Sequence, residues 1–352
     1  MEDDIMTKRF LCLTLCILLI ALSICACKDN TAEPDTTPTT TVATTEATTE
    51  ATTVATTAAT TAPEEPEDDG IYIPRPEKKV KNILMIGNSF CYYFVEELVG
   101  IAAADGNEIV LANLYKSGCK VQDHWNNYSN GSSAYEFFVT NKSGRGKPPI
   151  TTMQDAMDFA KSRLGGDWDV ITLQQSCAVM IGGDVESAKA QTLPYAQNLY
   201  NVIKENFPSA TLYWQQPWAY EVGYPGINSK SDQTAQYDAI KAVAYAVAQE
   251  NGVNLVVTGD AWQIARQDET VDGTLCQRLA SNDGAGDNYH DGDIGGGQYL
   301  NACVWYEILM GESCVGNSWR PNNYTLSEEK IEILQNAAHE AVAAVYGPNY
   351  AQ

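Results

Sequence analysis

A serine, an aspartate and a histidine in this sequence have the types and the spacing of a nucleophile and its base. Ser89 lies in the motif Gly-Asn-Ser-Phe at 87–90, directly after the apolar run 82–86. Asp287 precedes His290 by three residues in a glycine-rich, acidic loop. A carboxylate at that spacing can accept the Nδ1 proton of the imidazole within one turn, so that Nε2 can take the proton of a serine hydroxyl. We therefore predict that these three residues form an acyl-transfer site.

The other histidines are weaker candidates for the base. The chain has 3 histidines. His339 lies one residue off the apolar stripe of the last predicted helix, which is typical of a surface histidine. His124 follows Asp123 directly, and neighbours in sequence do not face each other. His290 is therefore the predicted base.

Ser89 needs a strand before it and a helix after it. The run 82–86 is typical of a buried parallel strand, and apolar residues recur at helical spacing over 93–104. Ser89 would then lie in a tight turn at the carboxyl end of a strand, where open α/β sheets bind ligands. Unpaired N–H groups opening the helix would stabilise an oxyanion. The alternative is an ordinary turn in which Ser89 caps the helix.

Predicted strands and helices alternate along the rest of the domain. Such alternation implies right-handed crossovers and predicts a three-layer α/β/α sandwich with a mostly parallel, five-stranded sheet. The predicted strands are 82–86, 108–115, 168–173, 211–214 and 254–257, and the predicted helices after 93–104 are 193–205, 232–249, 299–310 and a last one that ends before Gly347.

The first 70 residues differ in composition from the rest. Basic residues and the apolar run 10–24 precede Cys27, so 1–27 is predicted to be a secretion signal of the lipoprotein type with Cys27 as the lipidated residue. Without that modification the protein would still be exported. The Thr-rich segment 28–70 has too few large apolar groups to fold and is predicted to be a disordered stalk. Residues 71–352 form the predicted catalytic domain.

The chain is acidic throughout. Its formal net charge is -23, and the part after Gly70 still has 32 acidic against 19 basic residues. Such a field opposes nucleic acid and anionic lipid surfaces. A neutral, sugar-like substrate fits this charge better than a polyanion.

Several short motifs, taken in order, resemble the SGNH/GDSL hydrolase superfamily, in a branch known mainly as a domain of unknown function. The resemblance implies the SGNH-hydrolase fold, which is flavodoxin-like. The motifs are Gly-Asn-Ser-Phe at 87–90, the loop at Gly118 after the second strand, the amides Gln174 and Gln175 after the third strand, and Asp287-x-x-His290.

The resemblance also implies roles for these residues. Ser89 would be the nucleophile, His290 the base and Asp287 the residue that orients it. The backbone N–H groups of Ser89 and Gly118 would form the oxyanion hole. The superfamily usually has Gly-x-Asn in its third block, whereas this chain has Gln174 and Gln175; either amide could donate, and Gln175 is slightly favoured.

Together these features predict an exported, surface-anchored serine esterase that hydrolyses O-acyl esters, O-acetyl esters in particular, on glycans or small molecules. We expect no cofactor, no metal, no nucleic-acid partner, contact with the membrane only through the lipid anchor, and a monomer. The alternative is a non-catalytic glycan-binding or adhesive lipoprotein on the same fold.

Three other patterns have alternative interpretations. The acidic loop 283–293 could bind calcium, although it lacks the spacing of a twelve-residue calcium loop. Large aromatics near strand ends could form a sugar platform or, more commonly, belong to the core. Buried free thiols are expected at the cysteines that follow the first three strands, although a disulfide between two of them is an alternative. The aromatics are Trp214, Trp218 and Trp262, and the cysteines are Cys91, Cys119 and Cys177.

Overall fold

The computed structural model describes residues 79–268, 271, 296–322 and 324–352. The predictions made for Cys27, Asp287, His290 and the acidic loop 283–293 lie outside the described residues, as do the signal segment and the stalk.

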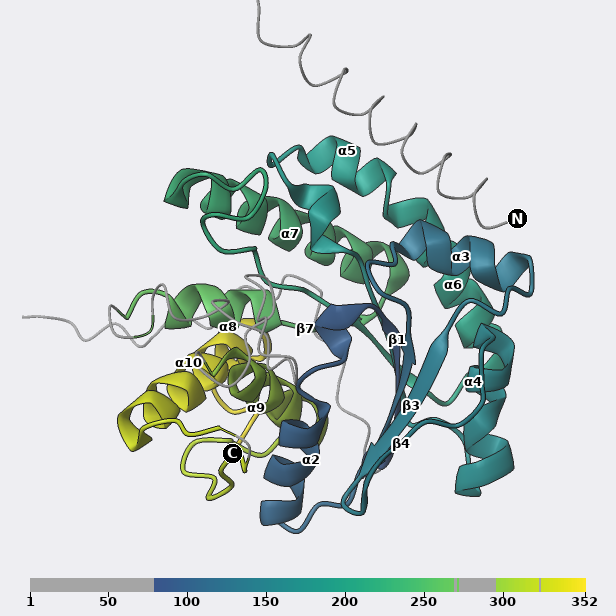
Figure 1. Ribbon diagram of the computed structural model, residues 1–352, viewed down its shortest axis with the longest axis horizontal. Coiled ribbons are helices and arrows are strands. Elements are labelled where there is room, and N and C mark those ends of the chain that lie inside the picture. The colour runs from purple at the N-terminus through teal and green to yellow at the C-terminus, as the bar shows by residue number, and fades with distance from the viewer. Residues whose placement is uncertain (1–78, 269–270, 272–295, 323) are drawn as a thin grey trace, which may run out of the picture. The chain divides into compact units, whose positions relative to one another are not determined.

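The central sheet is mostly parallel and has seven strands in the order β4-β3-β2-β1-β5-β6-β7 (Figure 1). The five predicted strands are all present and pair in parallel, with β1 between β2 and β5. The strands are β1 (Asn82–Gly87), β2 (Val110–Tyr115), β3 (Glu136–Asn141), β4 (Gly144–Gly146), β5 (Val170–Gln174), β6 (Thr211–Gln215) and β7 (Asn254–Val256).

The predicted number of strands was wrong, because the sheet has seven strands and not five. Strands β3 and β4 form an antiparallel hairpin at the edge next to β2. Strand β4 is only Gly144–Gly146 and has no apolar side chain, so its sequence carries no strand pattern. Its pairing with β3 comes from backbone hydrogen bonds, which any sequence can form.

Helices cover both faces of the sheet, which confirms the three-layer sandwich. Helices α2, α8, α9 and α10 pack together on one face, and α3 to α7 pack on the other (Figure 1). None of the helices in the described ranges is long and apolar enough to cross a membrane. The helices are α2 (Val95–Ala104), α3 (Val121–Ser129), α4 (Met153–Phe159), α5 (Val185–Ala190), α6 (Leu193–Asn206), α7 (Lys230–Asn251), α8 (Thr258–Ala265), α9 (Gly297–Met310) and α10 (Glu328–Tyr346).

The aromatic residues near the strand ends belong to the core rather than to an exposed sugar platform. Trp214, Trp218 and Trp262 are all buried. The rings of Trp218 and Trp262 stack with centroids 4.5 Å apart, and the ring of Phe90 lies 4.4 Å from that of Trp218. The residue after Ser89 is therefore anchored in a packed aromatic cluster.

The cysteines within the described ranges are buried free thiols, as expected, including Cys91, Cys119 and Cys177. Burial raises the pKa of Cys91 to about 12 and that of Cys119 to about 12. A thiol with such a pKa is protonated at neutral pH and is a poor nucleophile. Ser89 therefore has no competing thiolate among these residues.

His339 has a structural role that its sequence position did not reveal. Its Nδ1 lies 3.2 Å from both carboxylate oxygens of Glu307, and that carboxylate is fully buried between α9 and α10. The surface interpretation of His339 was therefore incomplete, because the imidazole partners a buried acid on the neighbouring helix.

Glu97, on α2, is a second buried acid, and it has no basic partner among the hydrogen bonds of its carboxyl group. Burial raises its pKa from 4.5 to about 7. The folded chain therefore keeps this proton over a pH range in which the unfolded chain has released it. The contribution of Glu97 to the free energy of unfolding is therefore complete below pH 4.5 and is lost as the pH rises to about 7.

We predict that Glu97→Gln removes this pH dependence. One pKa unit corresponds to ~1.4 kcal/mol, so the free energy of unfolding of the wild type should fall by about 3 kcal/mol relative to the variant between pH 4.5 and 7.5. Urea unfolding of both proteins across this range measures the difference between their free energies of unfolding. The other carboxyl groups contribute equally to both proteins, so their effect cancels in this difference. Parallel pH profiles would contradict the prediction.

Candidate active site

Ser89 lies at the carboxyl edge of the sheet, where it was predicted. Strand β1 ends at Gly87, and Ser89 opens a short 3₁₀ turn, Ser89–Cys91. The helix that follows begins later than predicted, at Val95. Because a helix dipole acts only within the first turn, the N–H groups that open α2 are not placed to serve Ser89. Any oxyanion donors must come from the loops around it.

The side chain of Asn88, not that of Ser89, caps this turn. Asn88 Oδ1 accepts a hydrogen bond of 3.0 Å from the N–H of Phe90. Ser89 Oγ has no hydrogen-bond partner within the described ranges, and the residue is partly exposed. The alternative in which Ser89 is a capping residue is therefore wrong. Its hydroxyl remains available for chemistry.

Amide side chains from three neighbouring strands hold the turn in place. Asn113 of β2 donates to the carbonyl of Cys91 at 2.6 Å, and Gln215 of β6 donates to the carbonyl of Phe90 at 2.8 Å. Gln174 of β5 donates to Asn88 Oδ1. Because these donors lie on packed strands, they fix the backbone on both sides of Ser89. Asn113 and Gln215 were not among the predicted site residues; the available signal was a polar amide inside, or at the end of, an otherwise apolar strand.

The loop after β2 is fastened beside the serine turn. Lys116 N–H donates to the carbonyl of Gly87 at 3.1 Å, and Asn88 Nδ2 donates to the carbonyl of Cys119 at 3.1 Å. Gly118 lies between these two contacts, at φ 61, a conformation that favours glycine. No hydrogen bond engages the N–H of Ser89 or of Gly118 within the described part of the chain. Both are thus candidate oxyanion donors on adjoining loops.

Gln175 has a structural role instead of the oxyanion role that was slightly favoured. Its Nε2 donates to Thr192 Oγ1 at 2.9 Å and to the carbonyl of Gln191 at 3.3 Å. Its Oε1 accepts from the N–H of Val121 at 3.1 Å. Both amide hydrogens are therefore used away from the serine. Gln174 keeps one amide hydrogen after its bond to Asn88, so only Gln174 of the two can still donate to a ligand.

His124 does not serve Ser89. Its side chain is fully buried, and Nδ1 lies 3.0 Å from the hydroxyl of Tyr135. Burial lowers its pKa to about 3, so it stays neutral and is a weak base. Because His339 is held by Glu307, the two histidines that the structure describes are both engaged elsewhere. His290 is left as the candidate base by elimination.

The described residues contain no group of three or more His, Cys, Asp or Glu side chains that could hold a metal ion. The alternative in which the loop 283–293 binds calcium concerns residues outside these ranges and stays open.

A family model for a domain of unknown function, DUF4886, matches residues 82–341, which is most of the chain. The chain belongs to the DUF4886 family. A DUF4886 family protein from Bacteroides uniformis has a crystal structure that aligns with a TM-score of 0.63 and 26% identity, covering 78% of this chain and 98% of that one. The two DUF4886 proteins therefore share their fold over nearly the whole length of the protein from Bacteroides uniformis.

More distant solved structures also align with this DUF4886 protein. A lipase/acylhydrolase from Enterococcus faecalis has a TM-score of 0.39 and 15% identity over 66% of this chain and 96% of that one. A variant of an acetyl xylan esterase from Geobacillus stearothermophilus has a TM-score of 0.36 and 12% identity over 69% of this chain and 98% of that one. A search of curated proteins finds no match.

Asn88 is the residue whose loss should disturb this site most without touching the hydroxyl. We predict that Asn88→Ala lowers the free energy of unfolding by about 2 to 4 kcal/mol, because it leaves buried partners unsatisfied at about 1 to 3 kcal/mol each. Turnover should also fall, because the loop of Gly118 loses its link to the turn. Urea unfolding and ester turnover measure the two effects. Asn126→Ala, at an exposed position of α3, is the matched control, and equal effects of the two changes would contradict the prediction.

Proposed function

We propose that this protein is a serine ester hydrolase that removes O-acyl groups, O-acetyl groups in particular, from glycans. One observation carries the proposal: the turn around Ser89 is held by side chains from three strands, while the Ser89 hydroxyl itself has no hydrogen-bond partner among the described residues. A serine retained for packing or capping would use its hydroxyl within the fold. A nucleophile instead needs a fixed backbone and a hydroxyl left for its base.

In the proposed reaction, Ser89 Oγ attacks the carbonyl carbon of the ester while His290 takes its proton and Asp287 orients the imidazole. The N–H groups of Ser89 and Gly118 stabilise the negative charge on the carbonyl oxygen, and Gln174 can add its remaining amide hydrogen. His290 returns the proton to the leaving alcohol. Water, activated by the same histidine, then hydrolyses the acyl-enzyme and regenerates Ser89.

The charge of the chain supports an uncharged substrate. The acidic excess after Gly70 opposes polyanions, whereas acetylated sugars carry no charge. Export and anchorage belong to the same proposal, because an enzyme with a signal segment over 1–27 and a lipidated Cys27 would meet glycans outside the cell. The segment 28–70 would then act as the spacer between anchor and enzyme.

The proposal is tested with p-nitrophenyl acetate and a serine-directed fluorophosphonate probe, in buffer that contains EDTA. We expect turnover, and labelling that maps to Ser89. Release of acetate from a panel of acetylated polysaccharides would then identify the glycan. A chain that neither turns over the ester nor reacts with the probe would instead support the non-catalytic glycan-binding alternative.

A further inference from the structure

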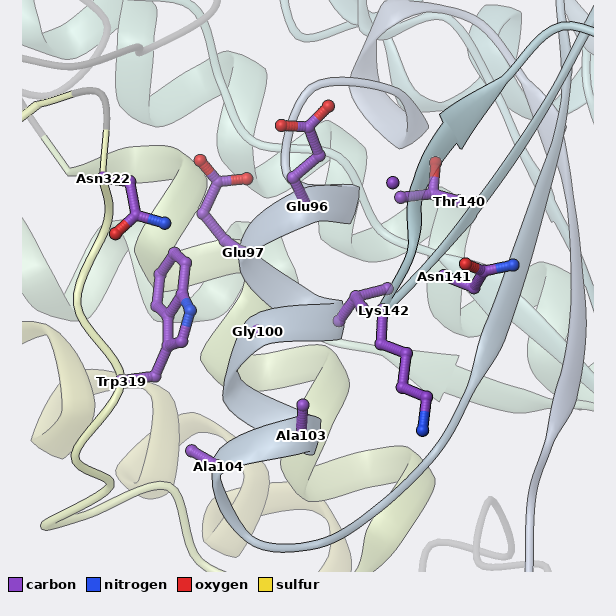
Figure 2. A pocket seen from close by; sticks show the side chains of 12 residues that line it. Glu96, Glu97, Gly100, Ala103, Ala104, Thr140, Asn141, Lys142, Trp319 and Asn322 are labelled. Carbon is purple, nitrogen blue, oxygen red and sulfur yellow. The ribbon is translucent and has the colours of Figure 1, made fainter.

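A groove of about 640 Å³ runs along one face of α2 (Figure 2). Helix α2 provides its floor, Thr140 and its neighbours on β3 form one wall, and Trp319 and Asn322 form the other. None of its lining residues belongs to the turn 88–91 or to the loop at Gly118. The groove is therefore separate from the residues that hold Ser89.

The position of the Trp319 wall depends on a glycine of α2. A Cβ atom at Gly100 would lie 2.1 Å from Nε1 of Trp319, so only glycine lets the indole approach the helix this closely. Ala103 and Ala104 continue the same helical face one turn further on. The volume of the groove over this face lies in the range of roughly 300 to 1,000 Å³ that is typical of ligand sites.

Two buried polar groups that line the groove lack the partners they need. Glu97 is only 4% exposed; its Oε1 accepts a hydrogen bond of 3.4 Å from the hydroxyl of Tyr324, but its Oε2 has no partner among the residues that the structure describes. Thr140 is 1% exposed, and its Oγ1 also has none. Buried polar atoms are normally hydrogen-bonded, and each exception requires an explanation. A ligand in the groove that carries hydroxyl groups would supply both partners.

The charges around the groove favour an uncharged ligand. The carboxylate of Glu96 opposes an anion, whereas Glu97 adds little charge because burial raises its pKa to about 7. Lys142, on the wall formed by β3, is paired with Glu108, so this ion pair adds no net charge to the groove. A sugar hydroxyl can donate to the carboxyl group of Glu97 and accept from Thr140, and the apolar side of a sugar ring can pack on the indole of Trp319. The groove thus combines an aromatic wall with hydroxyl-binding groups.

We propose that this groove binds a segment of an uncharged oligosaccharide. Because it uses neither Ser89 nor Gly118, binding here is independent of ester hydrolysis and can be tested whether or not the chain is an esterase.

Isothermal titration calorimetry of the full chain with cellohexaose, xylohexaose and mannohexaose tests the proposal. We expect at least one of these uncharged hexasaccharides to bind with a Kd below about 1 mM. A hexamer of glucosamine and a hexamer of galacturonic acid are the cationic and anionic comparisons. Absence of binding by all three neutral probes, or tighter binding of either charged hexamer, would overturn the proposal.

Two variants assign the binding to the groove. Trp319→Ala should weaken it at least tenfold, with Trp125→Ala on α3 as the matched control that leaves it unchanged. Because Trp319 also packs against α2, Thr140→Val is the cleaner change: valine has the same shape, and the lost hydroxyl makes no bond within the described fold. It should weaken binding several-fold while thermal stability stays equal or rises. Unchanged binding in both variants would exclude the groove.

Discussion

Replacing Ser89 with alanine should abolish ester hydrolysis while the fold stays intact. The hydroxyl is the proposed nucleophile, and removal of a nucleophile that acts with a base leaves only the catalysis provided by the oxyanion donors and by binding. We expect kcat to fall by about 10⁴-fold to 10⁶-fold. Stability should hardly change, because Ser89 Oγ makes no hydrogen bond within the described part of the chain. Turnover of p-nitrophenyl acetate and urea unfolding measure the two quantities.

The neighbouring Asn88 separates loss of chemistry from loss of structure. Ser89→Ala should lose activity at constant stability, whereas Asn88→Ala should lose both, because its side chain bonds Phe90, Gln174 and Cys119. Wild-type turnover by Ser89→Ala would remove this serine from the mechanism. Loss of stability in that variant would show that its hydroxyl has a structural partner after all.

Replacing His290 with alanine should reduce activity as much as the loss of Ser89. A serine and its base act as one unit, so removal of either costs about as much as removal of both. The double variant Ser89→Ala/His290→Ala should therefore be no less active than either single variant. Initial rates at high enzyme concentration measure this non-additivity.

His339→Gln is the matched control among the histidines. His339 is bound to Glu307 between α9 and α10, so its loss should affect stability rather than chemistry. The pH profile of kcat/KM adds a second readout, because the wild type should lose activity as the base becomes protonated and His339→Gln should keep the same profile. If His339→Gln lost activity and His290→Ala kept it, the assignment of the base would be wrong.

Local sequence patterns determined the framework of this protein. The apolar run 82–86 predicted β1 because an unbroken run of β-favouring residues is stable only when both faces of a strand are buried. Its end at Gly87 then placed Ser89 at the carboxyl edge. Strong local patterns also predicted β5 and α9. Helix α3 and the hairpin of β3 and β4 were not predicted; α3 is mostly polar and buries few residues, and β4 is held by backbone pairing.

The roles of the polar side chains were decided by tertiary structure. Gln174 and Gln175 are neighbours with identical side chains, yet one holds Asn88 and the other holds Thr192 and Val121. An amide can donate or accept in many directions, so its type does not reveal its partner. That choice depends on which strands lie side by side.

The groove along α2 was likewise decided by tertiary structure, because its walls come from distant parts of the chain. Gly100 and Trp319 lie more than two hundred residues apart in the sequence, and neither residue predicts the other. Apolar periodicity determined which elements form, because burial depends mainly on each residue and its near neighbours. The contacts of Glu97, Thr140 and Asn88 were decided only by the packing of those elements, because a hydrogen bond requires two particular groups to meet.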